Sequence, residues 1–303
     1  MSKTLNKERV CLGVDLGGTF VRIGFVRRDE CVYHVKKIRT AEVVNDFGAF
    51  VRQMIDQYRG EFLVERIVLA VPGLVDQTRG MITSLPNIPA LEGKPLGRTL
   101  ETMTGLPVVL DNDTNVQFVY DLRTHELENC PDVLGFYIGT GFGGALKLNG
   151  TIRRGEHGAA GEIAHIPIAN NRLICGCGNT GCLETIASGV ALNRIHKTHF
   201  PTLSIEDVFS KHANHQAIQT FIKDIATGIA TAVNLLDVST CLLGGGVIAM
   251  RDFPHAMLVH KIKSMLRSDM MRDALTIHIV EDKPDRGVIG AGLTGFAYKE
   301  ASS

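Results

Sequence analysis

The chain has 303 residues, of which 45% are hydrophobic and 21% are charged, and lysine plus arginine balance aspartate plus glutamate at 32 each. This composition is typical of a globular protein of about two domains, and the absence of a basic surplus argues against nucleic acid or anionic lipid as a partner. Because no apolar run approaches the roughly 20 residues of a membrane span and the N-terminus lacks a signal-peptide apolar stretch, we expect a cytoplasmic protein with no membrane partner.

The first half of the chain is predicted to be a strand-rich α/β region. Three short strands are expected within residues 9–39, with a Gly-Gly turn between the first two. They are followed by a helix near 47–58, a strand at 67–71, a hairpin at 75–82, a helix near 94–104 and a strand at 107–112. Helical patterning then resumes.

The second half opens in a similar way and then becomes mostly helical. A strand over 133–141 leads into a hairpin that turns at Asn149-Gly150. Beyond a loop rich in glycine and cysteine, the pattern predicts helices at 184–199, 205–211 and 216–236, strands at 240–243 and 275–280, and a C-terminal helix. Since each half opens with a strand and a Gly-Thr turn, we expect a duplicated α/β unit. The predicted domains are 1–117 and 118–303, with the C-terminal helix available to pack back on the first.

Two matched glycine turns are candidates for binding phosphate groups. They comprise Asp15, Gly17, Gly18 and Thr19 in the first half and Gly139, Thr140 and Gly141 in the second. Glycine lets backbone N–H groups approach an anion without an intervening Cβ atom. A Gly-Gly pair between strands is also an ordinary hairpin turn, and the match between the halves is what favours the phosphate-binding interpretation.

A third glycine turn, at residues 244–246, follows a strand and precedes a helix. Bare backbone at this place accommodates a flat ligand such as adenine, whereas a tight strand-to-helix crossing explains the same glycines without a ligand. The chain contains no GxxxxGK[ST] motif, which excludes a P-loop.

A cluster of polar residues at 111–115 ends a strand and starts a helix. Asp113 at such a junction can be a simple helix N-cap. Beside it, Asn112 and Asn115 add amide groups, and together these side chains offer the donors and the carboxylate that a polyhydroxyl ligand needs. The position is also the strand end at which α/β folds place their sites. Asp113 is therefore a candidate general base, with the N-cap as the alternative.

The seven cysteines fall into two groups. Cys11, Cys31, Cys130 and Cys241 stand singly and are expected to be small buried hydrophobic side chains. The remaining three, Cys175, Cys177 and Cys182, lie within eight residues and with His165 give the ligand set of a closed tetrahedral zinc site. The loop has little apolar content, so we expect a structural Zn2+ to supply its ordering energy.

Taken together, these motifs resemble the ROK family, which contains bacterial sugar kinases and sugar-responsive repressors. The resemblance covers nearly the whole chain. It rests on DLGGT at 15–19, VPG at 71–73, LPNIP at 85–89, DNDTN at 111–115, GTGFGG at 139–144, HGAAGEIAH at 157–165, CGCGNTGCLE at 175–184 and LGGGV at 243–247. It implies an actin-like, hexokinase-type (ribonuclease H-like) fold with two α/β domains around a cleft, in a homodimer or homotetramer.

The resemblance also implies an ATP-dependent kinase in which Asp113 accepts the proton of the attacking sugar hydroxyl. The sugar-binding residues that it implies are Gly73, Asn87, Asn112, Asp113, Glu162, His165 and Glu184. The implied nucleotide-binding residues are Asp15, Gly17, Gly18, Thr19, Gly139, Thr140, Gly141, Gly245 and Gly246, with Mg2+ arriving with ATP. His165, as a zinc ligand with Cys175, Cys177 and Cys182, would fix the wall of the sugar site.

Two further expectations concern DNA and the sugar. Related repressors carry a helix-turn-helix domain before the DxGGT turn, whereas only fourteen residues precede Asp15, so we expect no DNA binding. Asp111, Ala164 and Ala90 depart from the glucokinase-like pattern, and the chain has no tryptophan. The RTAEV segment at 39–43 resembles kinases of D-allose, and this resemblance implies D-allose, phosphorylated at its 6-hydroxyl, with glucose, fructose and N-acetylmannosamine as alternatives. A non-catalytic sugar sensor is the alternative from another class.

Overall fold

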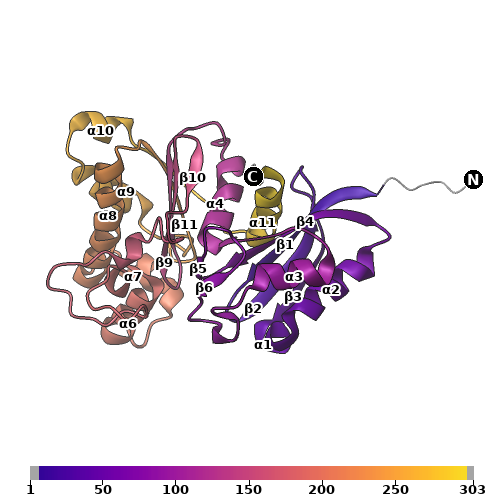
Figure 1. Cartoon of the computed structure of the whole chain (residues 1–303). Helices are drawn as coiled ribbons and strands as arrows, with labels where there is room; N and C mark the ends of the chain where they lie inside the picture. The colour runs from indigo at the N-terminus through magenta and orange to yellow at the C-terminus, as the bar shows by residue number, and fades with distance from the viewer. Residues whose placement is uncertain (1–6, 299–303) are drawn as a thin grey trace, which may run out of the picture. The chain divides into compact units, whose positions relative to one another are not determined.

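The computed structural model describes residues 7–298, which divide into two compact units (Figure 1). Unit 1 contains the described residues up to Thr124, the segment Arg154–Ala159 and the chain from Lys283 onward. Unit 2 contains His125–Arg153 and Ala160–Asp282. The division into domains at residue 118 remains a prediction. Within residues 7–298, no helix combines the length and the apolar character that crossing a membrane would require.

Unit 1 is built on one mixed five-stranded sheet in the order β3-β2-β1-β4-β7. Its strands are β1 (Glu8–Leu16), β2 (Phe20–Val26), β3 (Val32–Arg39), β4 (Phe62–Val71) and β7 (Val108–Asn112). The β3-β2-β1 pairs are antiparallel and the β1-β4-β7 pairs are parallel. The helices are α1 (Thr40–Val43), α2 (Phe47–Tyr58), α3 (Leu96–Thr104), α4 (Asp113–Thr124) and α11 (Arg286–Ala297), with a small hairpin of β5 (Leu74–Val75) and β6 (Ile82–Ser84) and short turns η1 (Val44–Asp46) and η2 (Pro89–Leu91).

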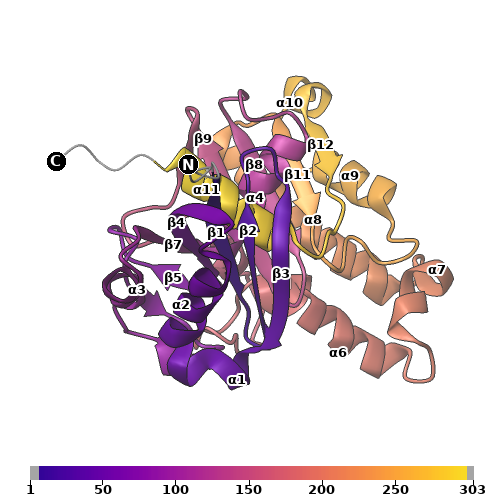
Figure 2. The same cartoon turned by 90° about the vertical axis from the view of Figure 1, so that its right-hand side faces the viewer.

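The central strand β4 is buried on both faces because helices cover both sides of the sheet. Ile67 and Leu69 belong to the core shared with α2 and α3, whereas Val68 and Ala70 belong to the core shared with α4 and α11. Figure 2 shows α2 and α3 in front of this sheet and α11 behind it. This two-sided burial explains the continuous apolar run of β4.

Unit 2 repeats the same sheet in the order β10-β9-β8-β11-β12. Its strands are β8 (Val133–Ile138), β9 (Phe142–Leu148), β10 (Thr151–Arg153), β11 (Thr240–Gly244) and β12 (Thr276–Ile279). Again the first two pairs are antiparallel and the last two are parallel. The duplicated α/β unit expected from the sequence is therefore confirmed.

The helices of unit 2 pack around α8 (Gln216–Leu236), whose apolar residues recur at helical spacing and are buried. The others are α5 (Glu184–Ala187), α6 (Gly189–His199), α7 (Val208–His212), α9 (His255–Ser264) and α10 (Asp269–Ala274), with short turns η3 (Ile163–His165) and η4 (Ile205–Asp207). The single helix expected over 184–199 is interrupted at Ser188. Ser188 has extended backbone, and its hydroxyl oxygen accepts the Ala191 N–H at 3.4 Å, so it caps a new helix.

Candidate functional site

The first glycine turn of unit 1 is held by its own backbone and by a buried threonine. The Gly17 N–H donates to the Phe20 carbonyl at 3.0 Å, and the Thr40 hydroxyl donates to the Gly17 carbonyl at 2.6 Å. A Cβ atom on Gly17 would lie 2.8 Å from the Phe20 carbonyl oxygen, so the turn needs glycine there. Asn87 lies beside the turn, with its Cβ atom 3.4 Å from the position that a Cβ of Gly18 would take.

Asp15, at the end of β1, is a half-buried carboxylate that faces Arg22. Burial raises the pKa of its carboxyl group, and Arg22, whose Nη1 lies 3.5 Å from Oδ2, opposes that shift. On another side Gly287 of α11 leaves room for it, because a Cβ there would lie 2.7 Å from Asp15 Cγ. A carboxylate buried at a cost, next to a glycine turn, is a feature of functional sites.

Asn112 and Asp113 form the corner between β7 and α4. The Asn112 Oδ1 accepts the Thr114 N–H at 2.9 Å, and its Nδ2 donates to the Gly73 carbonyl at 3.1 Å. Asp113, the first residue of α4, also accepts the Thr114 N–H through Oδ1 at 2.8 Å. Since Asn112 already supplies a capping oxygen, capping the helix does not by itself require an aspartate at 113. The structure thus brings Gly73, Asn112 and Asp113 together.

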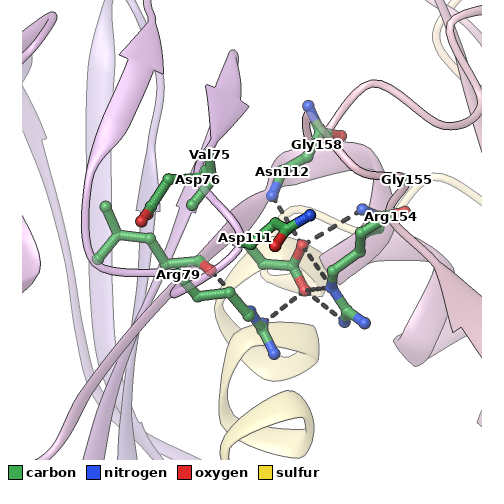
Figure 3. Close-up of a pocket in the computed structure, with 11 residues that line it drawn as sticks. Val75, Asp76, Arg79, Asp111, Asn112, Arg154, Gly155 and Gly158 are labelled. Carbon is green, nitrogen blue, oxygen red and sulfur yellow. Dashed lines mark hydrogen bonds and ion pairs between the residues drawn. The ribbon is translucent and has the colours of Figure 1, made fainter.

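Sequence reasoning did not identify the ion pairs that lie directly behind this corner (Figure 3). Asp111 is almost fully buried and pairs with Arg79 and Arg154 at 2.6 and 2.7 Å. These residues, with Asn112 and Asn115, line a cavity of about 110 Å³ within unit 1. Burial lowers the pKa of Arg79 to about 10, with Asp111 opposing the shift, so the guanidinium stays charged at neutral pH.

In unit 2 the matched glycine turn supplies carbonyl groups to the start of α6. The Gly139 and Thr140 carbonyl oxygens accept the N–H groups of Gly189 and Val190 at 2.8 and 3.1 Å. Beneath the turn lies the carboxylate of Glu184, whose Oε2 accepts the Phe142 N–H at 3.3 Å. A Cβ atom on Gly141 would lie 2.5 Å from that oxygen, so glycine is what allows Glu184 to lie so close.

The third glycine turn lies against the same end of β8. Gly245 has a φ of +97°, and a Cβ atom there would lie 2.5 Å from the Ile138 carbonyl oxygen. The tight crossing considered from the sequence therefore accounts for Gly245. Gly246 differs, because its Cβ position has no neighbour within 4 Å. Gly245 and Gly139 are near each other, since Ile138 directly precedes Gly139.

His165, Cys175, Cys177 and Cys182 come together as one cluster. Their ligand atoms all lie within 4.8 Å of one another. The Cys177 and Cys182 sulfurs are 3.7 Å apart, and the Cys175 sulfur is 3.7 Å from His165 Nδ1. A tetrahedral zinc ion with Zn–S bonds of about 2.3 Å separates its sulfur ligands by about 3.8 Å. The cluster therefore fits a structural Zn2+ in both ligand chemistry and spacing.

Burial raises the pKa of the Cys175 thiol to about 12, so a thiolate there needs a cation beside it.

Of the single cysteines, Cys11 and Cys241 are buried as expected. Cys130 is half-buried and Cys31 is exposed, so the prediction of a buried side chain is wrong for these two; Cys31 directly precedes the edge strand β3.

Glu162 and Glu184 flank this cluster on the side of His165. The imidazole Nε2 lies 3.4 Å from Glu162 Oε2, while its Nδ1 faces Cys175. Glu184 Oε1 accepts from the Cys175 thiol at 3.5 Å. Burial raises the pKa of Glu162, with Glu184 adding to the shift and His165 opposing it. Unit 2 thus places two carboxylates beside the cluster and its His165 imidazole, a set suited to binding sugar hydroxyls.

Comparisons with known proteins agree over nearly the whole chain. The model of the ROK family matches residues 11–294. An N-acetyl-D-glucosamine kinase from Vibrio cholerae is 30% identical over 78% of this chain and 83% of its own length. A glucokinase from Halalkalibacterium halodurans is 29% identical over 94% of each chain. The solved structure of a ROK hexokinase from Thermus thermophilus, 26% identical, superimposes with a TM-score of 0.79 over 95% of this chain and 98% of its own.

Proposed function

This chain belongs to the ROK family and has its actin-like, hexokinase-type fold, and on that premise we propose how it works and on which sugar. It is an ATP-dependent hexose kinase. The proposed reaction moves the γ-phosphoryl group of ATP to the 6-hydroxyl of a free hexose. Support comes from one observation above all: Asp113 directly follows Asn112, whose amide is fixed on Gly73 and whose oxygen caps α4.

Asp113 would take the proton of the attacking hydroxyl, a role worth roughly 10² to 10⁴ in rate. Phosphoryl transfer depends mainly on positioning and on neutralising charge on the transferred group. In unit 1, Asn112, Gly73 and Asn87 would bind the sugar. The turn at Gly17 and Gly18, with Asp15 and Thr19, would bind phosphates.

The proposal also assigns binding roles to residues of unit 2. Glu162, His165 and Glu184 would accept or donate hydrogen bonds to the sugar hydroxyls. The turn formed by Gly139, Thr140 and Gly141 would bind phosphates, and Gly245 and Gly246 would lie near the adenosine. Mg2+ would enter with ATP and neutralise phosphate charge.

A structural Zn2+ would be held by His165, Cys175, Cys177 and Cys182, and would supply the ordering energy that the loop lacks. His165 would bind it through Nδ1, which leaves Nε2 toward Glu162. An imidazole fixed in this way presents a defined face to the sugar.

We propose D-allose as the preferred hexose, from the RTAEV segment at 39–43 and from the departures at Asp111 and Ala164 from the glucokinase-like pattern. Glucose, fructose and N-acetylmannosamine are the alternatives, and the relatives named above make N-acetylglucosamine a necessary member of any test. A cytoplasmic homodimer or homotetramer that binds no nucleic acid completes the proposal.

The test is ADP release with ATP, Mg2+ and a panel of free hexoses: allose, glucose, mannose, fructose, N-acetylmannosamine and N-acetylglucosamine. We expect kcat/KM for allose to exceed all others. We also expect Asp113→Asn to lower kcat at least about a hundredfold while sugar binding stays within a few-fold. Asp273→Asn, the same change at an exposed residue of α10, is the matched control.

Other outcomes separate the alternatives. A different preferred sugar keeps the kinase and changes the substrate. If Asp113→Asn turned over as fast as the wild type, the assignment of the base would be wrong. Sugar binding without phosphorylation of any member of the panel would favour a sensor that retains the fold.

A further inference from the structure

A largely buried group of charged and polar side chains is centred on Asp111, which directly precedes the Asn112–Asp113 corner. We call Asp111, Arg79, Arg154 and Asn115 the Asp111 hub. Arg79 donates through Nη2 to Asp111 Oδ2 at 2.6 Å, and Arg154 donates to the same oxygen through Nη2 at 2.7 Å and Nε at 3.0 Å. Asn115 donates through Nδ2 to Oδ1 at 3.2 Å. Figure 3 shows both guanidinium groups converging on this one carboxylate.

The partners of Asp111 come from separate segments of unit 1. Arg79 lies in the hairpin between β5 and β6, Arg154 begins the segment Arg154–Ala159, and Asn115 lies in the first turn of α4. The Asp111 side chain is 3% exposed and those of Arg79 and Arg154 are 10% and 29% exposed. The hub is therefore largely shielded from water. Ion pairs in such shielded places are only weakly screened and hold a defined geometry.

The hub fixes the backbone on both sides of Asp111. Its Oδ1 accepts the Asn112 N–H at 3.0 Å. On the other side, the Arg79 Nε donates to the Leu110 carbonyl and the Leu110 N–H donates to the Arg79 carbonyl, both at 2.9 Å. Asn115 is held by Asp111 as well. Hydrogen bonds within the hub or to it therefore hold Leu110, Asp111 and Asn115, on either side of the Asn112–Asp113 pair. Thr114 itself is bound by Asn112 and Asp113.

One backbone feature indicates that this arrangement has a cost. Arg79 has a φ of +58°, in the left-handed region that is unfavourable for a residue with a Cβ atom. Such conformations are destabilising and persist where the surroundings determine them. Buried ion pairs are also frequently no better for stability than apolar side chains of similar size. Stability alone therefore gives little reason for two arginines at this strand end.

We propose that Arg79 and Arg154 are positioning residues for the kinase reaction, which act through Asp111 to hold the Asn112–Asp113 corner in its reactive geometry. This inference rests on the proposed function, in which Asp113 is the base. A displacement of about 1 Å in a reacting group can cost on the order of a hundredfold in rate. Loss of a hub arginine therefore lowers kcat more than it weakens the binding of ATP.

Arg154→Gln is the variant that tests this, because Arg79 still pairs with Asp111 when Arg154 is removed. Arg153→Gln is the matched control: it makes the same change of charge at the adjacent, exposed arginine. The measurements are the melting temperature, kcat, and KM for sugar and for ATP. We expect Arg154→Gln to lower kcat about 10- to 100-fold, with KM for ATP within about threefold and a melting temperature within a few degrees of wild type. Arg153→Gln should match the wild type.

Arg154→Lys separates positioning from simple charge. Lysine keeps the positive charge but cannot reproduce the fork that binds Asp111 through both Nε and Nη2. We expect an intermediate kcat, and this variant also carries the test if Arg154→Gln does not fold.

The inference is overturned if Arg154→Gln, or Arg154→Lys in its place, keeps the kcat of Arg153→Gln while Asp113→Asn is inactive. That result would leave Asp113 as the base and remove the role of the hub. A rise in KM for ATP with unchanged kcat would also contradict it. If the wild type phosphorylates no hexose, the proposed function fails and the inference fails with it.

Discussion

Unit 1 and unit 2 have sheets with the same arrangement of strands. They differ in the interactions that hold their polar segments, the Asn112 corner in unit 1 and the cysteine loop in unit 2. In unit 1 two arginines and one asparagine, from three separate segments, converge on Asp111 beside the corner at Asn112. In unit 2 the polar loop gathers around His165 and three cysteines. The same fold therefore accommodates a long-range ion-pair network in one copy and a local metal-binding cluster in the other.

The two means differ in their reach along the chain. The Asp111 ion pairs join residues that are 32 and 43 positions apart, so they depend on the whole of unit 1 being folded. The cysteine cluster lies within residues 165–182 and can form locally once a cation is present. We therefore expect metal loss to disorder one loop of unit 2. The following variants change single residues of one unit or the other and measure the effect on stability.

The largest effect is expected for Cys177→Ser. Loss of one thiolate from a structural zinc site removes most of a binding free energy of about 10 kcal/mol, so the loop should disorder and the soluble yield should fall. The measurements are zinc content by mass spectrometry and the melting curve. Cys31→Ser, at an exposed cysteine in unit 1, should keep both at wild-type values. A Cys177→Ser protein that folds normally without metal would show that the cluster is dispensable.

A smaller effect of opposite sign is expected for Asp15→Asn in unit 1. Burial raises the pKa of Asp15, so the folded state disfavours the charged form and loses stability above that raised pKa. Asparagine should therefore stabilise the protein at pH 7, with the gain vanishing in acid, while kcat falls. Thermal melting at pH 7 and pH 4 measures this, with Asp46→Asn, an exposed residue, as the control. A variant less stable than wild type at pH 7 would contradict it.

The smallest effect concerns His125, at the start of unit 2. Burial and the nearby His278, whose ring centroid is 5.6 Å away, lower the pKa of His125, while Glu281 opposes the shift. The neutral form is therefore favoured by folding, so its contribution to stability is full above about pH 6.5 and declines as pH falls through the lowered pKa.

We expect His125→Asn to reduce the loss of melting temperature between pH 7.5 and pH 5. The exposed His260→Asn is the control on α9. If the melting temperatures of wild type and His125→Asn fall in parallel with pH, His125 does not contribute to the pH dependence of stability.

Local signals were enough to predict most of the elements from the sequence. The helix expected over 216–236 is observed at those residues as α8. The turn at Asn149-Gly150 has positive φ at both residues, as an Asn-Gly hairpin requires. The cysteine cluster was also predictable, because three of its ligands lie within eight residues.

The Asp111 hub could not be predicted in the same way. Arg79 lies in a hairpin and Arg154 follows a short strand, and nothing in their neighbouring residues indicates that they share a carboxylate. Asp111 was noticed only as a departure from a family pattern. Long-range ion pairs follow from the tertiary arrangement, which periodicity and spacing do not encode. The break of the 184–199 helix at Ser188 did have a local signal, since serine is a preferred helix N-cap residue, and it was missed.

The order in which the chain leaves and re-enters unit 1 has a consequence for synthesis on the ribosome. The chain passes between the units after Thr124, Arg153, Ala159 and Asp282. Helix α11, which covers one face of the unit 1 sheet, follows unit 2 in the chain. All of unit 2 is translated before α11, so it can fold while unit 1 still exposes an apolar face of β4. Unit 1 is thus completed after unit 2, although most of its residues come first in the chain.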